Sequence, residues 1–410
     1  MATEIIDPIH GFIAADEDEM RVIDDPAFQR LRRINQLAGA HMVYPGARHA
    51  RFEHSLGTMH ISGMAAAALM SRGRLTESQS RALRLAGLVH DIGHGPFSHL
   101  FESVMRAHRG LGGASHEEIG RRILAETSLG DALGRPRRRV ADLAFGGPAP
   151  SALPEIISGV MGTDTMDYLL RDGHFTGSEH ARVDHRRLVS SLVRLKGRMG
   201  LARSALHSFE SMMHSRRQMF RTVYFHRAVR AAQSTILRAF DLAAGELGLG
   251  SLTLEDYVGL TDDSAMAALR SLRPATRAVR DAQRLAREYE ARVLPRCVLD
   301  EALEGRAPDA AAMRAEVASA AGVEESLVIV DVTGASSVPL AAGGREMRHV
   351  TLVGEPRGEA TAEDVPFSSL PLLAALLGSM GTLRVYARGN TKKVASAASA
   401  AHRRWHAGGA

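Results

Sequence analysis

The sequence is poor in cysteine and lysine, with a single cysteine, Cys297, and three lysines among 410 residues. One cysteine excludes an internal disulfide framework and a thiolate zinc cluster, and it is typical of a reducing cytosol. The longest strongly apolar run, Met64 to Met70, is far short of the roughly 20 residues that span a bilayer, and the N-terminus has no signal-peptide pattern. We therefore expect a cytoplasmic protein that does not cross a membrane.

An excess of charge of one sign is also missing. The chain has 51 Lys and Arg against 46 Asp and Glu, a formal net charge of +5. This small excess is weak support for a nucleic-acid groove, so we do not expect nucleic acid as the main partner. Apolar residues make up 45% and charged residues 24%, which are ordinary values for a globular protein with a sizeable core.

Apolar residues at helical spacing dominate residues 1–245. Pro26 follows Asp25, which is an N-cap and first-turn signal. Phe28, Leu31 and Ile34 then fall three residues apart. The same pattern predicts helices over 52–70 and 77–90, a helix starting at Pro96, a loop at 144–151, and one long helix from 203 to about 247.

The pattern changes near residue 320. β-branched runs at 326–332, 348–353 and 381–387 predict strands, and a short helix is expected over 392–406. We therefore expect a mainly α fold, with a large helical domain over residues 1–320 and a small α+β lobe over 321–410.

Histidines and aspartates that suit metal chemistry are concentrated between His49 and Asp172. Arg-Phe-Glu-His supplies His54, the pair His90-Asp91 ends an apolar helix, and Asp164 lies in Gly-Thr-Asp-Thr-Met-Asp. Two imidazoles and two carboxylates would hold a divalent transition metal and leave positions open for water or substrate oxygen.

Two further histidines follow the His-Asp pair within nine residues. The glycines after Asp91 favour a close backbone turn, which would place His94 and His99 beside the metal rather than on it. A lone histidine on a helix is more often a hydrogen-bonded core or surface residue, the interpretation we give to four others. These are His60, His180, His207 and His214.

The sequence resembles the HD-domain metal phosphohydrolases, and most closely the deoxynucleoside triphosphate triphosphohydrolases of the sterile-alpha-motif/HD-domain type, without a sterile-alpha-motif domain. The segments that carry the resemblance are Asp7-Pro-Ile-His-Gly, 28–37, Tyr44-Pro-Gly-Ala, 51–57, 90–99, Asp167-Tyr-Leu-Leu-Arg-Asp, 216–226 and, weakly, 383–386. The resemblance implies a helical HD core at about residues 50–172 and a homo-oligomer, either a dimer or a tetramer.

The resemblance also implies roles for individual residues. It gives His54, His90, Asp91 and Asp164 as metal ligands, and His94, His99, Glu102 and His116 as catalytic residues. By the same resemblance, Arg51 and Arg216 would bind the triphosphate, and Gln36 and Asp172 would bind the sugar 3′-hydroxyl. Leu37 and Tyr168 would leave no room for a 2′-hydroxyl, and Tyr224 would lie near the sugar and base. Asp24, Gln29 and Arg32 match positions that bind a regulatory nucleotide, although charged residues on one helix more often simply form its solvent-exposed face.

Two positions depart from the family pattern. Glu102 stands where the family usually has Asp, and Thr165 stands where it usually has a phosphate-binding lysine. The missing cation weakens the case for a triphosphate unless another arginine compensates.

Three functions follow as alternatives. The leading one is hydrolysis of deoxynucleoside triphosphates to deoxynucleoside and inorganic triphosphate, by attack of metal-activated water on the α-phosphate. The second is an HD phosphohydrolase of another nucleotide: a mono- or diphosphate, a cyclic nucleotide, or a modified one in a biosynthetic pathway. The third is a non-catalytic nucleotide sensor or nucleic-acid-binding regulator. One divalent metal per site is expected, with iron, manganese, zinc, nickel and magnesium all open, and magnesium on the substrate phosphates as a further option.

Overall fold

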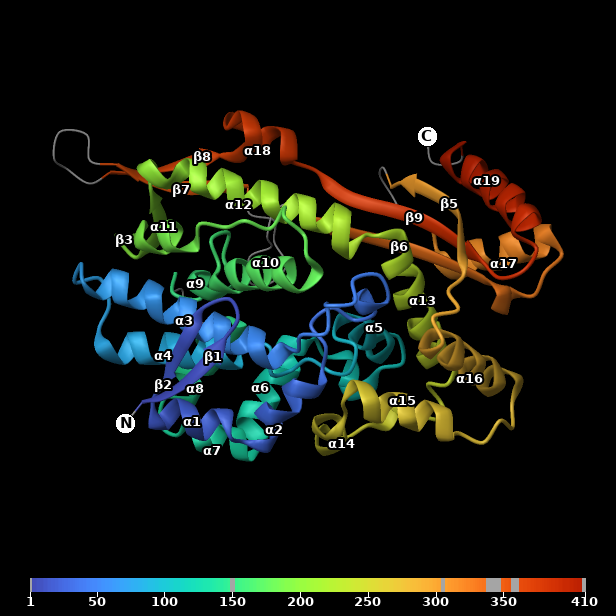
Figure 1. Cartoon of the computed structure of the whole chain (residues 1–410), viewed down its shortest axis with the longest axis horizontal. Helices are drawn as coiled ribbons and strands as arrows, with labels where there is room; N and C mark the ends of the chain where they lie inside the picture. The colour runs from blue at the N-terminus through green and yellow to red at the C-terminus, as the bar shows by residue number, and fades with distance from the viewer. Residues whose placement is uncertain (1, 148–151, 304–306, 337–347, 355–360, 408–410) are drawn as a thin grey trace.

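The computed structural model describes residues 2–147, 152–303, 307–336, 348–354 and 361–407. A helical body contains most of the chain, and a small sheet with two helices lies at one end of it (Figure 1). The mainly α fold with a C-terminal α+β part is confirmed. No helix within the described ranges has both the length and the apolar character needed to cross a bilayer.

The helical body contains the first sixteen α-helices of the described chain. They are α1 Glu17–Ile23, α2 Pro26–Gln29, α3 Arg51–Met70, α4 Glu77–Val89, α5 His99–Ala107, α6 His116–Glu126, α7 Ser128–Leu133, α8 Arg137–Phe145, α9 Glu155–Ser158, α10 Thr163–Thr176, α11 His185–Ser190, α12 Leu206–Met219, α13 Arg227–Leu242, α14 Leu254–Gly259, α15 Asp262–Ser271 and α16 Arg277–Glu290.

Helix α3 is the centre of this body, and it packs against both α4 and α10. It is buried on almost all sides, because small and apolar residues such as Gly57, Ile61 and Ala65 occupy every face. Helix α4 begins with a capping box in which Thr76 and Gln79 each bond the other's backbone, and α6 begins with the same device. These caps fix the starts of two helices that deliver site residues.

Strands form three small sheets. β1 Thr3–Asp7 and β2 Gly11–Ala15 form an antiparallel hairpin. The second sheet has the order β3 Leu192–Leu195, β4 Arg198–Ala202, β7 His349–Gly354 and β8 Thr361–Pro366, with β4 and β7 parallel. The third has the order β5 Arg296–Ala302, β9 Ser379–Ala387 and β6 Val328–Ser336, all antiparallel.

The third sheet has its own core, formed with α17 Ala310–Ala321 and α19 Thr391–Ala407. Leu299, Val317, Val385 and Val394 are among its buried side chains. We call this unit (β5, α17, β6, β9 and α19) the C-terminal lobe. Strands β7 and β8 and α18 Pro371–Leu376 instead join the helical body, so the chain passes between the two parts more than once. The boundary expected near residue 320 stays a prediction.

Three expected helices differ from the structure. The long helix over 203–247 is broken into α12, a π-helical turn at Phe220–Tyr224 and α13, because the chain leaves helical geometry at Phe225 and His226. The helix expected from Pro96 begins only at His99, since Phe97 and Ser98 have positive φ values of 53° and 58°. The helix at Pro26 is a single turn followed by a 3-10 turn at Arg30–Arg33. The expected strands and the C-terminal helix are present.

Candidate metal centre and substrate pocket

Four side chains from three helical segments meet at one point. His54 comes from the first turn of α3, His90 and Asp91 follow the last turn of α4, and Asp164 lies in the first turn of α10. The Nε2 atom of His54 lies 3.0 Å from Asp164 Oδ1 and 3.2 Å from His90 Nε2. Asp91 Oδ1 lies 3.3 Å from His90 Nε2. The structure thus brings together the four residues expected to hold a metal.

The donor chemistry of this group fits a divalent metal. The Nδ1 atom of His90 bonds the Gly87 carbonyl and that of His54 bonds Asp167, so both imidazoles present an Nε2 lone pair inward. Lone pairs only 3.2 Å apart repel unless a cation or a proton lies between them. Burial would lower the pKa of His54, yet its hydrogen bonds with Asp164 and Asp167 outweigh burial and raise that pKa to about 10. The site therefore attracts positive charge.

A buried network behind His54 was not among the expected site residues. Asp167 accepts from His54 Nδ1 at 2.8 Å, from His10 Nε2 at 2.7 Å and from Arg171 Nε at 2.8 Å. Arg171 Nη1 also donates to Asp7 Oδ2 at 2.8 Å, which ties the β1–β2 hairpin to the metal centre. Both Asp7-Pro-Ile-His-Gly and Asp167-Tyr-Leu-Leu-Arg stood out in the sequence, but nothing there showed that they touch.

Close packing of α3 on α10 makes this network possible. A Cβ atom at Gly57 would lie 1.9 Å from Asp167 Oδ1 and 2.5 Å from Arg171 Nη2. Any side chain at position 57 would therefore push the carboxylate away from His54. The glycine in Arg-Phe-Glu-His-Ser-Leu-Gly is thus required by the helix contact.

Asp91 connects the metal centre to an arginine and a further histidine. Its Oδ2 accepts from Arg51 Nη1, while its Oδ1 lies 3.5 Å from His94 Nε2. Arg51 is buried and its Nε donates to Ser98 Oγ at 2.8 Å. Arg51 is therefore held beside the candidate metal ligands by two partners, Asp91 and Ser98.

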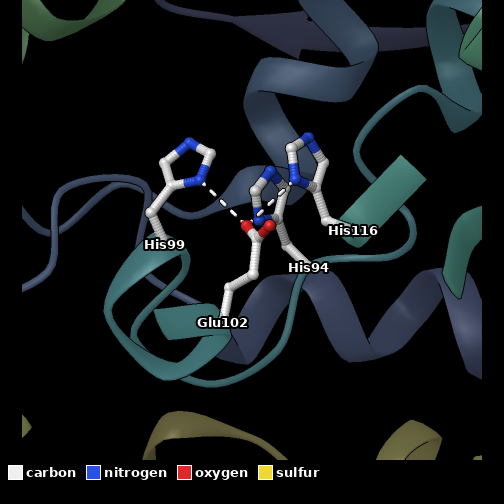
Figure 2. A group of neighbouring side chains, drawn as sticks. All are labelled: His94, His99, Glu102 and His116. Carbon is white, nitrogen blue, oxygen red and sulfur yellow. Dashed lines mark hydrogen bonds and ion pairs between the residues drawn. The ribbon is translucent and has the colours of Figure 1, made fainter. Parts of the chain in front are cut away.

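Figure 2 shows the second cluster, His94, His99, Glu102 and His116. Glu102 Oε2 accepts from His99 Nδ1 at 3.2 Å and from His116 Nδ1 at 3.0 Å. The rings of His94 and His116 stack with centroids 4.0 Å apart. Burial would raise the pKa of Glu102, but bonds from His116 and His99 hold it well below its ordinary value. Although the ligand atoms lie within 4.8 Å of one another, the carboxylate already satisfies two imidazole N–H groups, so we interpret the cluster as one that holds protons.

His94 is the most buried member of that cluster. Burial lowers its pKa, and the nearby Arg51 and His116 lower it further. Its Nδ1 has no hydrogen-bond partner among the described residues. The lowered pKa favours the neutral form of His94, which joins the second cluster to Asp91 through its Nε2 atom, 3.5 Å from Asp91 Oδ1.

Both clusters border one pocket of about 470 Å³. Among the expected residues, its lining contains Gln36, Leu37, Arg51, His54, Asp91, His94, His99, His116, Asp164, Tyr168, Asp172 and Tyr224. The lining also contains Phe220, Phe225, Arg230 and Gln233, which sequence reasoning did not select. Their position follows from the break between α12 and α13, which carried no sequence signal beyond the aromatic residues.

The residues expected at the sugar lie together in this lining. Asp172 accepts from His49 Nε2 at 2.8 Å and from the Tyr224 hydroxyl at 2.7 Å. The Gln36 side-chain oxygen is buried without a protein partner among the described residues, so it can accept a bond from a ligand. Leu37 completes this end of the pocket.

Arg216 and Thr165 do not line the pocket. Arg216 is buried against two residues of the lining: its Nε donates to the Tyr168 hydroxyl at 3.1 Å, and its guanidinium lies 4.5 Å from the centre of the Phe220 ring. Thr165 is 6% exposed. Position 165 thus presents no cation to the pocket, and the phosphate role of Arg216 stays a prediction.

The three residues expected at a regulatory nucleotide are not grouped in one cavity. Asp24 lines a separate pocket of about 510 Å³ with Thr3 and Arg21. Gln29 and Arg32 bond each other instead, with 2.8 Å between Arg32 Nε and Gln29 Oε1. Their nucleotide role also stays a prediction.

Comparison with known proteins finds two matching family models and several similar proteins. Residues 51–146 match the HD domain, and residues 183–343 match the HD associated region. The chain is 34% identical over 270 residues to an uncharacterized protein of Methanocaldococcus jannaschii, covering 65% of this chain and 54% of the relative. It is 30% identical over 351 residues to the deoxynucleoside triphosphate triphosphohydrolase SAMHD1 of Homo sapiens, covering 71% and 54%. The chain thus spans about half the length of these relatives.

A solved structure shares the whole fold. A hypothetical protein from Aquifex aeolicus superposes with a TM-score of 0.76 at 27% identity, over 97% of this chain and 100% of the other. The matched HD domain contains His54, His90 and Asp91, and the associated region contains the pocket wall at 220–233. The chain therefore belongs to the HD-domain phosphohydrolase superfamily.

Proposed function

We propose that this protein hydrolyses deoxynucleoside triphosphates to deoxynucleoside and inorganic triphosphate. The observation that carries the proposal is that one pocket adjoins three groups of side chains. These are the candidate metal-binding group, the pair of histidines joined by Glu102, and the polar residues Gln36 and Asp172. The similarity to SAMHD1 supports the same substrate class.

His54, His90, Asp91 and Asp164 would hold one divalent metal. When bound, such a metal polarises a phosphoryl oxygen and lowers the pKa of its water toward neutrality. The outward N–H groups of Arg51 would bind a phosphate oxygen, because a guanidinium keeps its charge and offers several donors. Asp91, its partner, fixes that guanidinium beside the reacting phosphate.

His99 is the proton donor that we assign to the leaving oxygen. It lines the pocket, and Glu102 bonds its Nδ1 so that Nε2 is the free nitrogen. The low pKa of Glu102 keeps the carboxylate ionised, which stabilises a protonated imidazole on either partner. A positioned acid of this kind contributes typically 10²–10⁴-fold to the rate.

The sugar would be held at the other end of the pocket. Gln36 and Asp172 supply acceptors for the 3′-hydroxyl, while Leu37 and Tyr168 leave a 2′-hydroxyl without space or partner. A buried hydroxyl left unpaired costs about 1–3 kcal/mol. Ribonucleotides should therefore be poor substrates.

A second candidate function has an observation of its own. Arg216 and Thr165 are not among the lining residues of the pocket, whose arginines in the described chain are Arg51 and Arg230. This arrangement favours a nucleotide with fewer phosphates, hydrolysed by the same metal and acid. The two candidates differ in their products, since only the first releases intact triphosphate.

The test is an incubation with the four deoxynucleoside triphosphates and their ribonucleotide counterparts, with manganese or magnesium, and products resolved by anion exchange. Guanosine triphosphate is present in half of the reactions as a possible activator. Intact triphosphate that disappears in His90→Ala/Asp91→Ala but persists in the exposed control His207→Ala would support the proposal. The same incubation with the corresponding mono- and diphosphates tests the second candidate, which predicts orthophosphate release from them. No turnover of any of these nucleotides would refute both candidates.

A further inference from the structure

The C-terminal lobe supports the wall of the pocket through three buried contacts. Arg384 Nη1 of β9 donates to the Phe225 carbonyl at 2.7 Å, and the Tyr386 hydroxyl donates to the Arg227 carbonyl at 2.9 Å. Asp331 of β6 receives two bonds from Arg230, at 3.0 Å from Nε and 2.5 Å from Nη2. All three contacts reach the short stretch in which α13 begins. The lobe therefore fixes where this stretch lies.

Hydrogen bonds continue from Arg230 to the other side of the pocket. Arg230 Nη1 donates to Gln233 Oε1 at 2.7 Å, and Gln233 Nε2 donates to the Ala38 carbonyl at 2.8 Å. Every donor and acceptor in this series has a defined partner. The series thus joins strand β6 to the loop 36–38.

The loop has little freedom at that point. Gly39 has a φ of 72°, and a Cβ there would already contact the Gln233 side chain at 3.4 Å. The next turn is closed by a bond from Ala40 N to the Leu37 carbonyl at 3.1 Å. A shift of the Gln233 amide would therefore move Leu37, which forms the sugar end of the pocket together with Gln36.

We propose that Asp331 and Gln233 are positioning residues through which the C-terminal lobe sets the distance of loop 36–38 from the sugar, and hence the discrimination against a 2′-hydroxyl. This inference rests on the proposed function, because it requires a nucleotide in the pocket. Neither residue is a catalytic residue. Asp331 does not line the pocket and acts through Arg230, whereas Gln233 lines the pocket but uses its amide oxygen and nitrogen on Arg230 and the Ala38 carbonyl.

The physical reason is that rejection of a hydroxyl depends on close fit. A pocket that excludes an added hydroxyl by shape discriminates by about 10²-fold. Loosening one wall would admit the hydroxyl and its water, so most of that factor would be lost. The chemistry on the phosphate, at the other end of the pocket, would change much less.

Three variants test the series. Gln233→Met removes both hydrogen bonds while keeping the side-chain length. Gln233→Glu keeps the oxygen that accepts from Arg230, but it places a second oxygen against the Ala38 carbonyl, where the two acceptors repel. Asp331→Asn removes the charge that holds Arg230. The matched control is Glu316→Gln, which weakens an exposed ion pair with Arg404 elsewhere on the lobe.

Two readouts are compared. The first is kcat and KM for each deoxynucleoside triphosphate and its ribonucleotide counterpart. We expect the ratio of kcat/KM values between deoxy and ribo substrates to fall about tenfold in all three variants, with KM for the deoxy substrate raised, kcat within threefold and the control unchanged. The second is amide hydrogen exchange of residues 34–42 without substrate, which should speed up in the variants alone.

Each outcome decides the matter. An unchanged ratio and unchanged exchange in folded Gln233→Met would overturn the inference, as would an equal loss in Glu316→Gln. If Asp331→Asn does not fold, the two Gln233 variants carry the test, since they alter no charge on the lobe. If the wild-type chain neither hydrolyses nor binds a nucleoside triphosphate, the proposed function and sugar selection fail together, while faster exchange would still establish the positioning of the loop.

Discussion

Replacing Asp167 with Asn tests whether the network behind His54 tunes the metal centre. The carboxylate accepts from His54, His10 and two nitrogens of Arg171, at distances between 2.7 and 3.0 Å. The Asn amide has one acceptor oxygen where the Asp carboxylate has two, and its NH2 group would face the N–H donors of the neighbouring side chains. His54 would lose both its orientation and the negative charge that makes its Nε2 a stronger ligand.

The expected loss of metal affinity is about 10- to 100-fold, the usual effect of removing such a partner. This corresponds to about 1.4–2.7 kcal/mol of binding free energy. Folding stability should also fall, because buried Arg171 would keep only Asp7 as a charged partner. The assay is competition for manganese with a fluorescent chelator, with chemical unfolding measured in parallel.

The matched control is Glu19→Gln. Glu19 is also a buried acid bonded to an arginine, Arg84, but it contacts none of the metal ligands. It should lose stability and keep its metal affinity. A folded Asp167→Asn protein that binds manganese as tightly as wild type would refute the reasoning, and His10→Ala, which removes a single bond, provides the milder second variant.

Four further outcomes are expected. Gly57→Ala should lower the free energy of unfolding by about 1–3 kcal/mol, because its Cβ would lie 1.9 Å from Asp167 Oδ1. Gly245→Ala is the control and should be nearly neutral, because nothing lies within 4 Å of a Cβ there. Equal unfolding midpoints for the two variants would contradict this reasoning. Burial and the neighbouring His10 lower the pKa of His60 to about 4, so His60 stays neutral in the folded state while the unfolded chain takes up a proton below about pH 6.5. The free energy of unfolding should therefore fall as the pH drops from 7 to 4, and it should fall less steeply in His60→Asn. Identical slopes of unfolding free energy against pH in the two proteins would exclude the effect. Glu102→Gln should lower kcat about 10²–10⁴-fold at little change in KM, and an unaltered kcat would remove Glu102 from the proton-donating cluster. Dialysis against a chelator should abolish hydrolysis and manganese should restore it, whereas full activity in demonstrably metal-free protein would argue against a metal-dependent reaction.

The sequence was sufficient to select the four candidate metal-binding residues, which the structure places close together, and to predict most of the helices. His90-Asp91 ends an amphipathic helix, and the helical spacing around it is strong, so both the element and its chemistry were visible locally. The β-branched runs likewise predicted β6, β7 and β9. Which sheet each strand joins depends on pairing over more than a hundred residues, as between β4 and β7, and no local pattern encodes it.

The structure adds what depends on contact between distant segments. Asp167 and His10 lie 157 residues apart, so their bond could not be inferred from either motif alone. The helical spacing around Arg216 did not indicate that its guanidinium contacts the Tyr168 hydroxyl and the Phe220 ring, because Tyr168 lies on a different helix. Positive φ values at Phe97 and Ser98 are forced by tertiary contacts, including the bond from Phe97 N to Asp262.

The π-helical turn at Phe220–Tyr224 makes the length of this segment as important as its composition. Each residue of an α-helix advances the chain by about 100° around the axis, so deleting one residue from the turn would rotate α13 by that angle relative to α12. Arg230 would then leave Asp331, and Gln233 would leave Ala38, although no side chain had been replaced. A one-residue deletion here should therefore damage the pocket more than most substitutions in the same turn, because the number of residues in the turn sets the rotation of α13 relative to α12.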